Sequence, residues 1–201
     1  MECHVLVDSD FFTMIAPCKN IDKEKEFVKS VFDSLNKKPC IHPFVAKEEL
    51  FNNEVVKQLI DEGYITVIDY NSVLKESWME QQYVDNFVTY YDYMNSEKIP
   101  SLSPEIKFSD IKRHHANKNM GEIHTLIFAH CLEIPLFMSN DKGAKKLAET
   151  KINSQHFSID VKNVCDVFCM IKTSGSIKLD TKVVRSILKK REEWREQYRD
   201  C

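Results

Sequence analysis

Glycine and proline are scarce in this chain of 201 residues, which contains four and six of them. A β-sandwich needs many tight turns, and low-complexity chains are rich in these residues, so both classes are disfavoured. Apolar residues make up 43% of the chain and charged residues 29%, the balance of a packed globular domain. The length predicts a single domain, 1–201, with room for an extension.

Other absences exclude kinds of site and location. No apolar run reaches the ~20 residues that a membrane-spanning helix needs, so no membrane partner is expected. The seven cysteines form no CxxC pair and there is no HExxH, so zinc is not expected. The odd cysteine number and the lack of a signal-peptide pattern predict free thiols in a reducing cytoplasm. A net charge of −3 means that any nucleic-acid contact must be a local basic patch.

Strand-like and helix-like patterns alternate along the chain. Short buried-strand runs are predicted at 4–7, 37–46, 64–70, 134–139 and 156–161, with helices at 21–35, 47–63, 73–97, 122–132, 142–149, 164–172 and 181–198. This order predicts an α/β fold with three α/β/α layers around a central, mostly parallel sheet. Residues 73–119 form the one plausible helical and irregular insertion, and 181–201 are expected to hold a C-terminal helix.

Acidic residues stand where the predicted strands end and helices begin. Asp8 follows the first strand, and Asp141 follows the strand at 134–139. Ligand sites in open parallel sheets lie beyond the carboxyl ends of the strands, so these two acids are expected at one edge. Glu49 and Glu122 fall in first turns of predicted helices. If those helices begin at the same edge, four carboxylates converge and repel, and Mg²⁺ or Mn²⁺ is the cation that hard oxygen ligands select.

Each acid also has a plain structural interpretation. Asp8 can form a turn after a strand, and Asp141 can cap the helix at 142–149. Glu122 can favour a helix dipole, and Glu49 can be a solvated helix residue. Taken together and in this order, the acids favour the metal site.

Two blocks of sequence resemble the PIN-domain nucleases, a fold found in many bacterial toxin ribonucleases and in flap-type nucleases. "VLVDSDFF" is similar to the family's opening strand, with Asp8 at the acidic position that ends it and Asp10 at the second position. "GEIHTLIFAHCLEIPLFMSND" is similar to the family's Gly-Glu helix followed by a strand and Ser/Thr-x-Asp. Glu122, Ser139 and Asp141 match that pattern, with Ser139 as a supporting hydrogen-bond donor or minor ligand.

A third block, "HPFVAKEEL", resembles the helix that carries the family's second acid. Glu49 fits the register, and the adjacent Glu48 is the alternative. The segment before Gly121 is longer than in the small toxins. The resemblance implies a cytoplasmic, Mg²⁺- or Mn²⁺-dependent endoribonuclease in which Asp8, Glu49, Glu122 and Asp141 are catalytic and bind metal. RNA is the implied substrate, DNA less often, and a toxin of this family would have a small antitoxin-like inhibitor protein.

Positive residues come just before the predicted acidic helix. The stretch "KRHHANKN" supplies Lys112, Arg113 and Lys118 as candidate contacts to substrate phosphates, and an ordinary solvated loop is the alternative. Aromatic residues in 78–93 are typical of a core or of a homodimer face, and stacking on unpaired bases is the alternative.

Two other functions fit parts of the pattern. The same fold with a degenerate acid cluster would be an inactive PIN-like module that acts through protein contacts. Asp8-Ser9-Asp10 is also similar to the Asp-x-Asp of haloacid-dehalogenase-type phosphatases, but "MSND" has no paired acid to complete that site. The number of metals, one or two, stays open.

Overall fold

A parallel sheet forms the centre of the computed structural model, which describes residues 3–95, 107–113, 119–154, 157–175 and 179–201. In these ranges five strands pair in the order β3-β2-β1-β4-β5, and every pair is parallel. They are β1 (Val5–Val7), β2 (Pro39–Ile41), β3 (Thr66–Val67), β4 (Leu136–Met138) and β5 (Asp160–Lys162). The predicted α/β class with a parallel sheet is confirmed.

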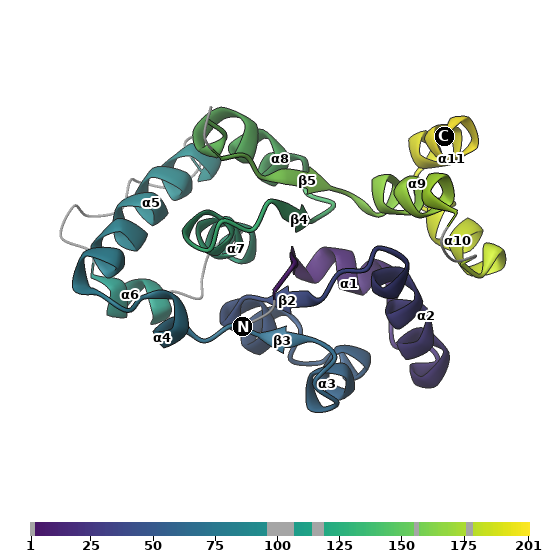
Figure 1. Cartoon of the computed structure of the whole chain (residues 1–201), viewed down its shortest axis with the longest axis horizontal. Helices are drawn as coiled ribbons and strands as arrows, with labels where there is room; N and C mark the ends of the chain where they lie inside the picture. Colours follow the sequence, from purple (N-terminus) through teal and green to yellow (C-terminus); the bar gives the residue numbers. More distant parts are fainter. Residues whose placement is uncertain (1–2, 96–106, 114–118, 155–156, 176–178) are drawn as a thin grey trace.

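Helices cover both faces of the sheet, and Figure 1 shows the two groups on either side of it. They are α1 (Ser9–Ile15), α2 (Ile21–Ser34), η1 (Val45–Glu49, a π-helix), α3 (Glu54–Asp61), α4 (Tyr70–Val73), α5 (Ser77–Asn95), α6 (Phe108–Arg113), α7 (Met120–Cys131), α8 (Lys142–Leu147), η2 (Ala148–Ile152, a π-helix), α9 (Val164–Ser174), α10 (Thr181–Leu188) and α11 (Glu192–Asp200). Among the described residues, no helix combines the length and apolar character that a bilayer crossing requires.

The alternation of side chains along each strand divides the core in two. Val5 and Val7 of β1 face a cluster built with α1, α2, α3, α9, α10 and α11. Leu6, between them, faces a second cluster built with α5, α7 and α8. Because successive strand side chains point to opposite faces, one three-residue strand anchors both helical layers. The result is an α/β/α arrangement with β1 at its centre.

Two predicted helices are divided in the structure. The helix expected at 47–63 is divided, because Asn53 accepts a hydrogen bond from the Val56 N–H and starts α3 anew. Glu49 therefore lies at the end of η1, and its predicted place in a first helical turn is wrong. The helix expected at 181–198 is divided where Arg191 adopts an extended backbone. Residues within 73–119 contribute α5, whose buried Tyr83 and Phe87 belong to the second core.

The prediction of free thiols is wrong for four of the seven cysteines. Cys3 is joined to Cys40 with Cα atoms 5.9 Å apart, and Cys169 is joined to Cys201 with Cα atoms 5.8 Å apart. The partners are 37 and 32 residues apart in sequence, and only the pairing of β1 with β2 and the docking of α11 on α9 bring them together. Cys18, Cys131 and Cys165 are free. Disulfides persist in oxidising compartments, so these bonds argue against a reducing cytoplasm.

Candidate metal centre

Asp8 and Asp141 lie at the carboxyl edge of the sheet, at the ends of neighbouring strands β1 and β4. Each caps the helix that follows: Asp8 Oδ1 accepts from the Ser9 N–H at 2.8 Å, and Asp141 Oδ1 accepts from the Ala144 N–H at 2.8 Å. The Ser139 hydroxyl donates to Asp8 Oδ2 at 3.1 Å and accepts from the Asp141 N–H at 3.1 Å. Ser139 therefore links the two acids directly.

Asp10 joins the same edge through Asn140, which sequence reasoning missed. Both Asp10 carboxylate oxygens accept from the Asn140 N–H, at 3.1 and 3.0 Å, and the Asn140 side chain donates to the Asp10 carbonyl at 3.2 Å. Its side-chain oxygen accepts from the Val164 N–H at 3.0 Å. Buried Asn140 thus ties the starts of α1 and α9 to the end of β4. Its only signal in the sequence is its position between Ser139 and Asp141.

Glu49 reaches the edge from η1 and packs against the start of α7. The Gly121 N–H and the Ser9 side chain both hydrogen-bond to its carboxylate, and a Cβ placed on Gly121 would overlap it. Gly121 is therefore the residue that allows this close approach. Of the two neighbouring acids, it is Glu49 that lies here, whereas Glu48 is exposed on η1.

Burial and neighbouring carboxylates raise the pKa values of Asp8, Asp10 and Glu122. Burial is the main cause of the pKa of Asp8 lying well above its usual value, and Glu122, Asp10 and Glu49 raise it further. Burial raises the pKa of Glu122 to about 7, and Glu49, Asp141 and Asp10 add to the shift. Burial likewise raises the pKa of Asp10 to about 6. Asp8 therefore lies within electrostatic reach of Glu122, Asp10 and Glu49, and Asp141 within reach of Glu122 and Asp10.

The exposure of the acids increases from Asp8 to Glu49. Asp8 is completely buried, Asp10, Glu122 and Asp141 are half-buried, and Glu49 is exposed at the rim. A ligand arriving from solvent would meet four of the acids before it reached Asp8. This gradient of burial is what a site for a cation and its bound substrate requires.

The donor set suits a hard cation, but its geometry is not that of an assembled metal site. Carboxylate oxygens and one hydroxyl are the ligands that Mg²⁺ and Mn²⁺ favour. Within the ranges that the structure describes, no three His, Cys, Asp or Glu side chains are gathered closely enough to hold one metal ion. Asp10 and Asp141 each accept hydrogen bonds from backbone N–H groups. Ligation of one cation would therefore require these side chains to move closer together.

The role of Lys112, Arg113 and Lys118 as substrate contacts stays a prediction. Lys112 and Arg113 end α6, and Lys118 lies outside the described residues. A cation that acts on the described acids is Arg191, which lowers the pKa of Asp10. It falls in the C-terminal helix predicted from the sequence, and its approach to the cluster depends on how α11 docks.

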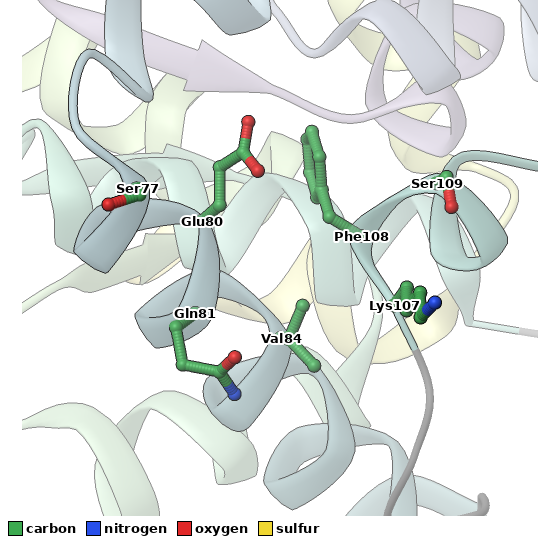
Figure 2. A pocket seen from close by; sticks show the side chains of 7 residues that line it. All are labelled: Ser77, Glu80, Gln81, Val84, Lys107, Phe108 and Ser109. Atoms are coloured by element: carbon green, nitrogen blue, oxygen red, sulfur yellow. The ribbon is translucent and has the colours of Figure 1, made fainter.

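A separate hollow of about 540 Å³ lies between α5 and α6 (Figure 2). Glu80, Gln81 and Val84 of α5 line it together with Lys107 and Phe108. None of the carboxylates at the sheet edge borders this hollow, so it is distinct from the candidate metal centre.

Comparison of the chain with protein-family models, with curated proteins and with solved structures finds no match. The function is therefore argued from the site itself.

Proposed function

We propose that this chain is a metal-dependent nuclease of PIN-like fold that hydrolyses RNA phosphodiesters. The observation that carries the proposal is Asp8, a fully buried carboxylate with three other acids close enough to raise its pKa. A buried ionised acid surrounded by acids is costly unless it takes up a proton or a positive ligand is bound. Strand-end acids of a parallel sheet are also where α/β proteins place their ligands.

The residues would divide the work by their position. Asp8 would bind the cation from a buried position, and Glu122 and Asp141 from half-buried ones. Glu49 would supply a further ligand from its exposed position. Ser139 would hold Asp8 and Asp141 in register, and Asp10 would support the site through Asn140. A bound Mg²⁺ or Mn²⁺ supplies a Lewis acid that activates water and neutralises phosphate charge. The resemblance to PIN-domain nucleases favours RNA as the substrate and an antitoxin-like inhibitor. It also implies a cytoplasmic location, against which the two disulfides count.

A second candidate is an inactive PIN-like module that acts through protein contacts. The observation in its favour is that the described acids are near one another without forming a three-ligand set. In that case the cluster would be the remnant of a site, with Asp8 and Asp141 retained as helix caps.

Hydrolysis of single-stranded RNA separates these candidates. Wild-type protein should cleave a labelled oligonucleotide in Mn²⁺ and not in EDTA, and Asp8→Asn combined with Asp141→Asn should reduce the rate at least ~100-fold. Asp61→Asn, an exposed acid at the end of α3, is the matched control and should keep full activity. Cleavage in EDTA, or full activity of the double variant, would refute the nuclease. A folded wild type that neither cleaves RNA nor gains thermal stability in Mn²⁺ would favour the module.

A further inference from the structure

The turn between α10 and α11 and the start of α11 contact the last turn of α1 and the first residue of α8. Lys190 in this turn donates from Nζ to the Met14 carbonyl of α1 at 3.5 Å. Glu193, in the first turn of α11, forms an ion pair with Lys142 at 3.8 Å. These two contacts reach the helices that begin directly after Asp8 and Asp141. In Figure 1, α9, α10 and α11 are packed together at one end of the molecule.

Arg191 lies in this turn and is held in place by an aromatic ring. Its guanidinium carbon is 4.6 Å from the ring centroid of Trp194, which is only 3% exposed. The Trp194 carbonyl accepts from the buried Cys165 thiol at 3.3 Å, so the ring beneath Arg191 belongs to the core. Stacking restricts the guanidinium while leaving its N–H donors at the edge of the plane.

No acid neutralises Arg191 by direct contact, although acids are near. The Arg191 backbone N–H donates to the Leu188 carbonyl at 3.3 Å, but among the residues that the structure describes its guanidinium forms no hydrogen bond and no ion pair. Asp10 is close enough for Arg191 to lower its pKa, but both Asp10 oxygens accept from the Asn140 N–H. A half-buried, oriented guanidinium beside a carboxylate cluster is therefore available to an anion from outside.

We propose that Arg191 binds a backbone phosphate of the nucleic-acid strand, on the α1 side of the acidic edge. The inference rests on the proposed function and adds to it the residue that positions the substrate. A planar guanidinium matches the geometry of a phosphate through two parallel N–H donors. The carboxylates hold the cation for the scissile phosphate, and Arg191 holds a neighbouring phosphate so that the strand cannot slide.

Lysines near Arg191 extend the same positive surface. Lys190 is adjacent to Arg191 in sequence. Burial is the main cause of its lowered pKa, and the nearby charge of Lys19 lowers that pKa further. Lys142 is highly exposed on the other side of the turn. Lys19, Lys190 and Arg191 bring local positive charge to a chain of net charge −3, next to the exposed Glu192 and Glu193. The strand would cross the edge from Lys19 and Lys190 past Arg191 towards Lys142.

Binding of a fluorescein-labelled single-stranded RNA tests this inference without needing hydrolysis. Anisotropy would be measured with and without Mn²⁺ on the Asp8→Asn chain, over a series of salt concentrations. Arg191→Gln should weaken binding about tenfold and reduce the slope of log K against log salt by ~0.7, the value for one lost phosphate contact on a single strand. Arg191→Lys should restore the slope and only part of the affinity, because lysine keeps the charge and loses the planar donors.

Arg199→Gln is the matched control, because Arg199 lies on the same helix and faces Asp200 at 3.2 Å. It should leave both affinity and slope unchanged. The inference is overturned if Arg191→Gln keeps the wild-type slope, if Arg199→Gln weakens binding equally, or if no RNA binds. RNA binding that depends on Arg191 in a wild-type chain without hydrolysis would leave this inference standing and remove the proposed nuclease. RNA hydrolysis at the wild-type rate by Arg191→Gln would overturn this inference and leave the proposed nuclease standing.

Discussion

Burial raises the pKa values of several acids in this chain and lowers the pKa values of two histidines. Both kinds of side chain avoid charge when they are taken out of water. For Asp8, Asp10 and Glu122 this means holding a proton at higher pH than usual. For His42 and His124, which are completely buried, it means giving the proton up. Single substitutions can therefore separate the two contributions to stability.

Replacing Glu122 by Gln should stabilise the protein at pH 8 in EDTA. The pKa of Glu122 is raised from 4.5 to about 7, so the folded state binds the proton more tightly than the unfolded state does. Stability then falls as the pH rises from 4.5 to 7, and the full cost is present above 7. Glu122→Gln should raise the free energy of unfolding by about 1–2 kcal/mol at pH 8 and leave it unchanged at pH 4.5. Urea unfolding at the two pH values measures this, and a destabilised variant at pH 8 would contradict it.

Replacing His124 by Phe should flatten the loss of stability in acid. His124 Nδ1 and the Tyr83 hydroxyl form a buried hydrogen bond, and burial lowers the pKa of His124 from 6.5 to about 3. The unfolded state therefore binds a proton below pH 6.5 that the folded state refuses, and stability falls as the pH drops. One such histidine contributes ~1.4 kcal/mol per pH unit in this range. Unfolding of His124→Phe between pH 6.5 and 5 should show a slope smaller by that amount, and an unchanged slope would exclude the buried neutral histidine.

At the scale of elements, the site depends on helices that start at the same edge of the sheet. The strand-end acids Asp8 and Asp141 could be predicted, because a parallel sheet places the ends of its strands together. Glu49 could be identified by its register in the sequence. Its place at the end of a π-helix could not be predicted, because a single π-helical turn such as η1 leaves no periodic pattern in the sequence. Asn140 could not be assigned a role, since its partners at Asp10 and Val164 come from distant parts of the chain.

Substituting Gly121 by Ala tests the contact between η1 and α7. Alanine favours a helix by up to ~1 kcal/mol over glycine, so the fold should keep its stability in EDTA. Its Cβ would overlap the Glu49 carboxylate and displace it. The rise in melting temperature on adding Mn²⁺ should therefore fall by about half or more. Thr89→Ala, on the exposed surface of α5, is the control for helix propensity and should leave the Mn²⁺ effect unchanged. An intact Mn²⁺ effect in Gly121→Ala would remove Glu49 from the site.

At the scale of the whole molecule, the fold class could be read from the alternation of strands and helices. The position of Arg191 at the acidic edge and the two disulfides could not. Both depend on packing between segments that are far apart in the sequence, such as the docking of α11 on α9. Cysteine spacing carries no information about a bond between adjacent parallel strands, and a charge on a terminal helix reads as solvated until its neighbours are known.

Thiol counting tests the disulfides. The chain unfolded in guanidinium without reductant should expose three thiols, those of Cys18, Cys131 and Cys165, and seven after reduction. Each bond closes a loop of more than 30 residues, so reduction should lower the free energy of unfolding by roughly 2–4 kcal/mol per bond. Seven thiols before reduction, in protein purified without reductant, would show that the bonds do not form. That result would restore the prediction of free thiols in a reducing cytoplasm.

Anomalous diffraction from crystals soaked in Mn²⁺ tests the central claim most directly. The account predicts a peak at the carboxyl ends of β1 and β4, with oxygens of Asp8, Glu122 and Asp141 about 2.0–2.3 Å from it and Glu49 turned inward. Crystals of Asp8→Asn soaked in the same way should lose that peak. A wild-type crystal with no peak among these carboxylates, while Mn²⁺ occupies other sites on the molecule, would contradict the account.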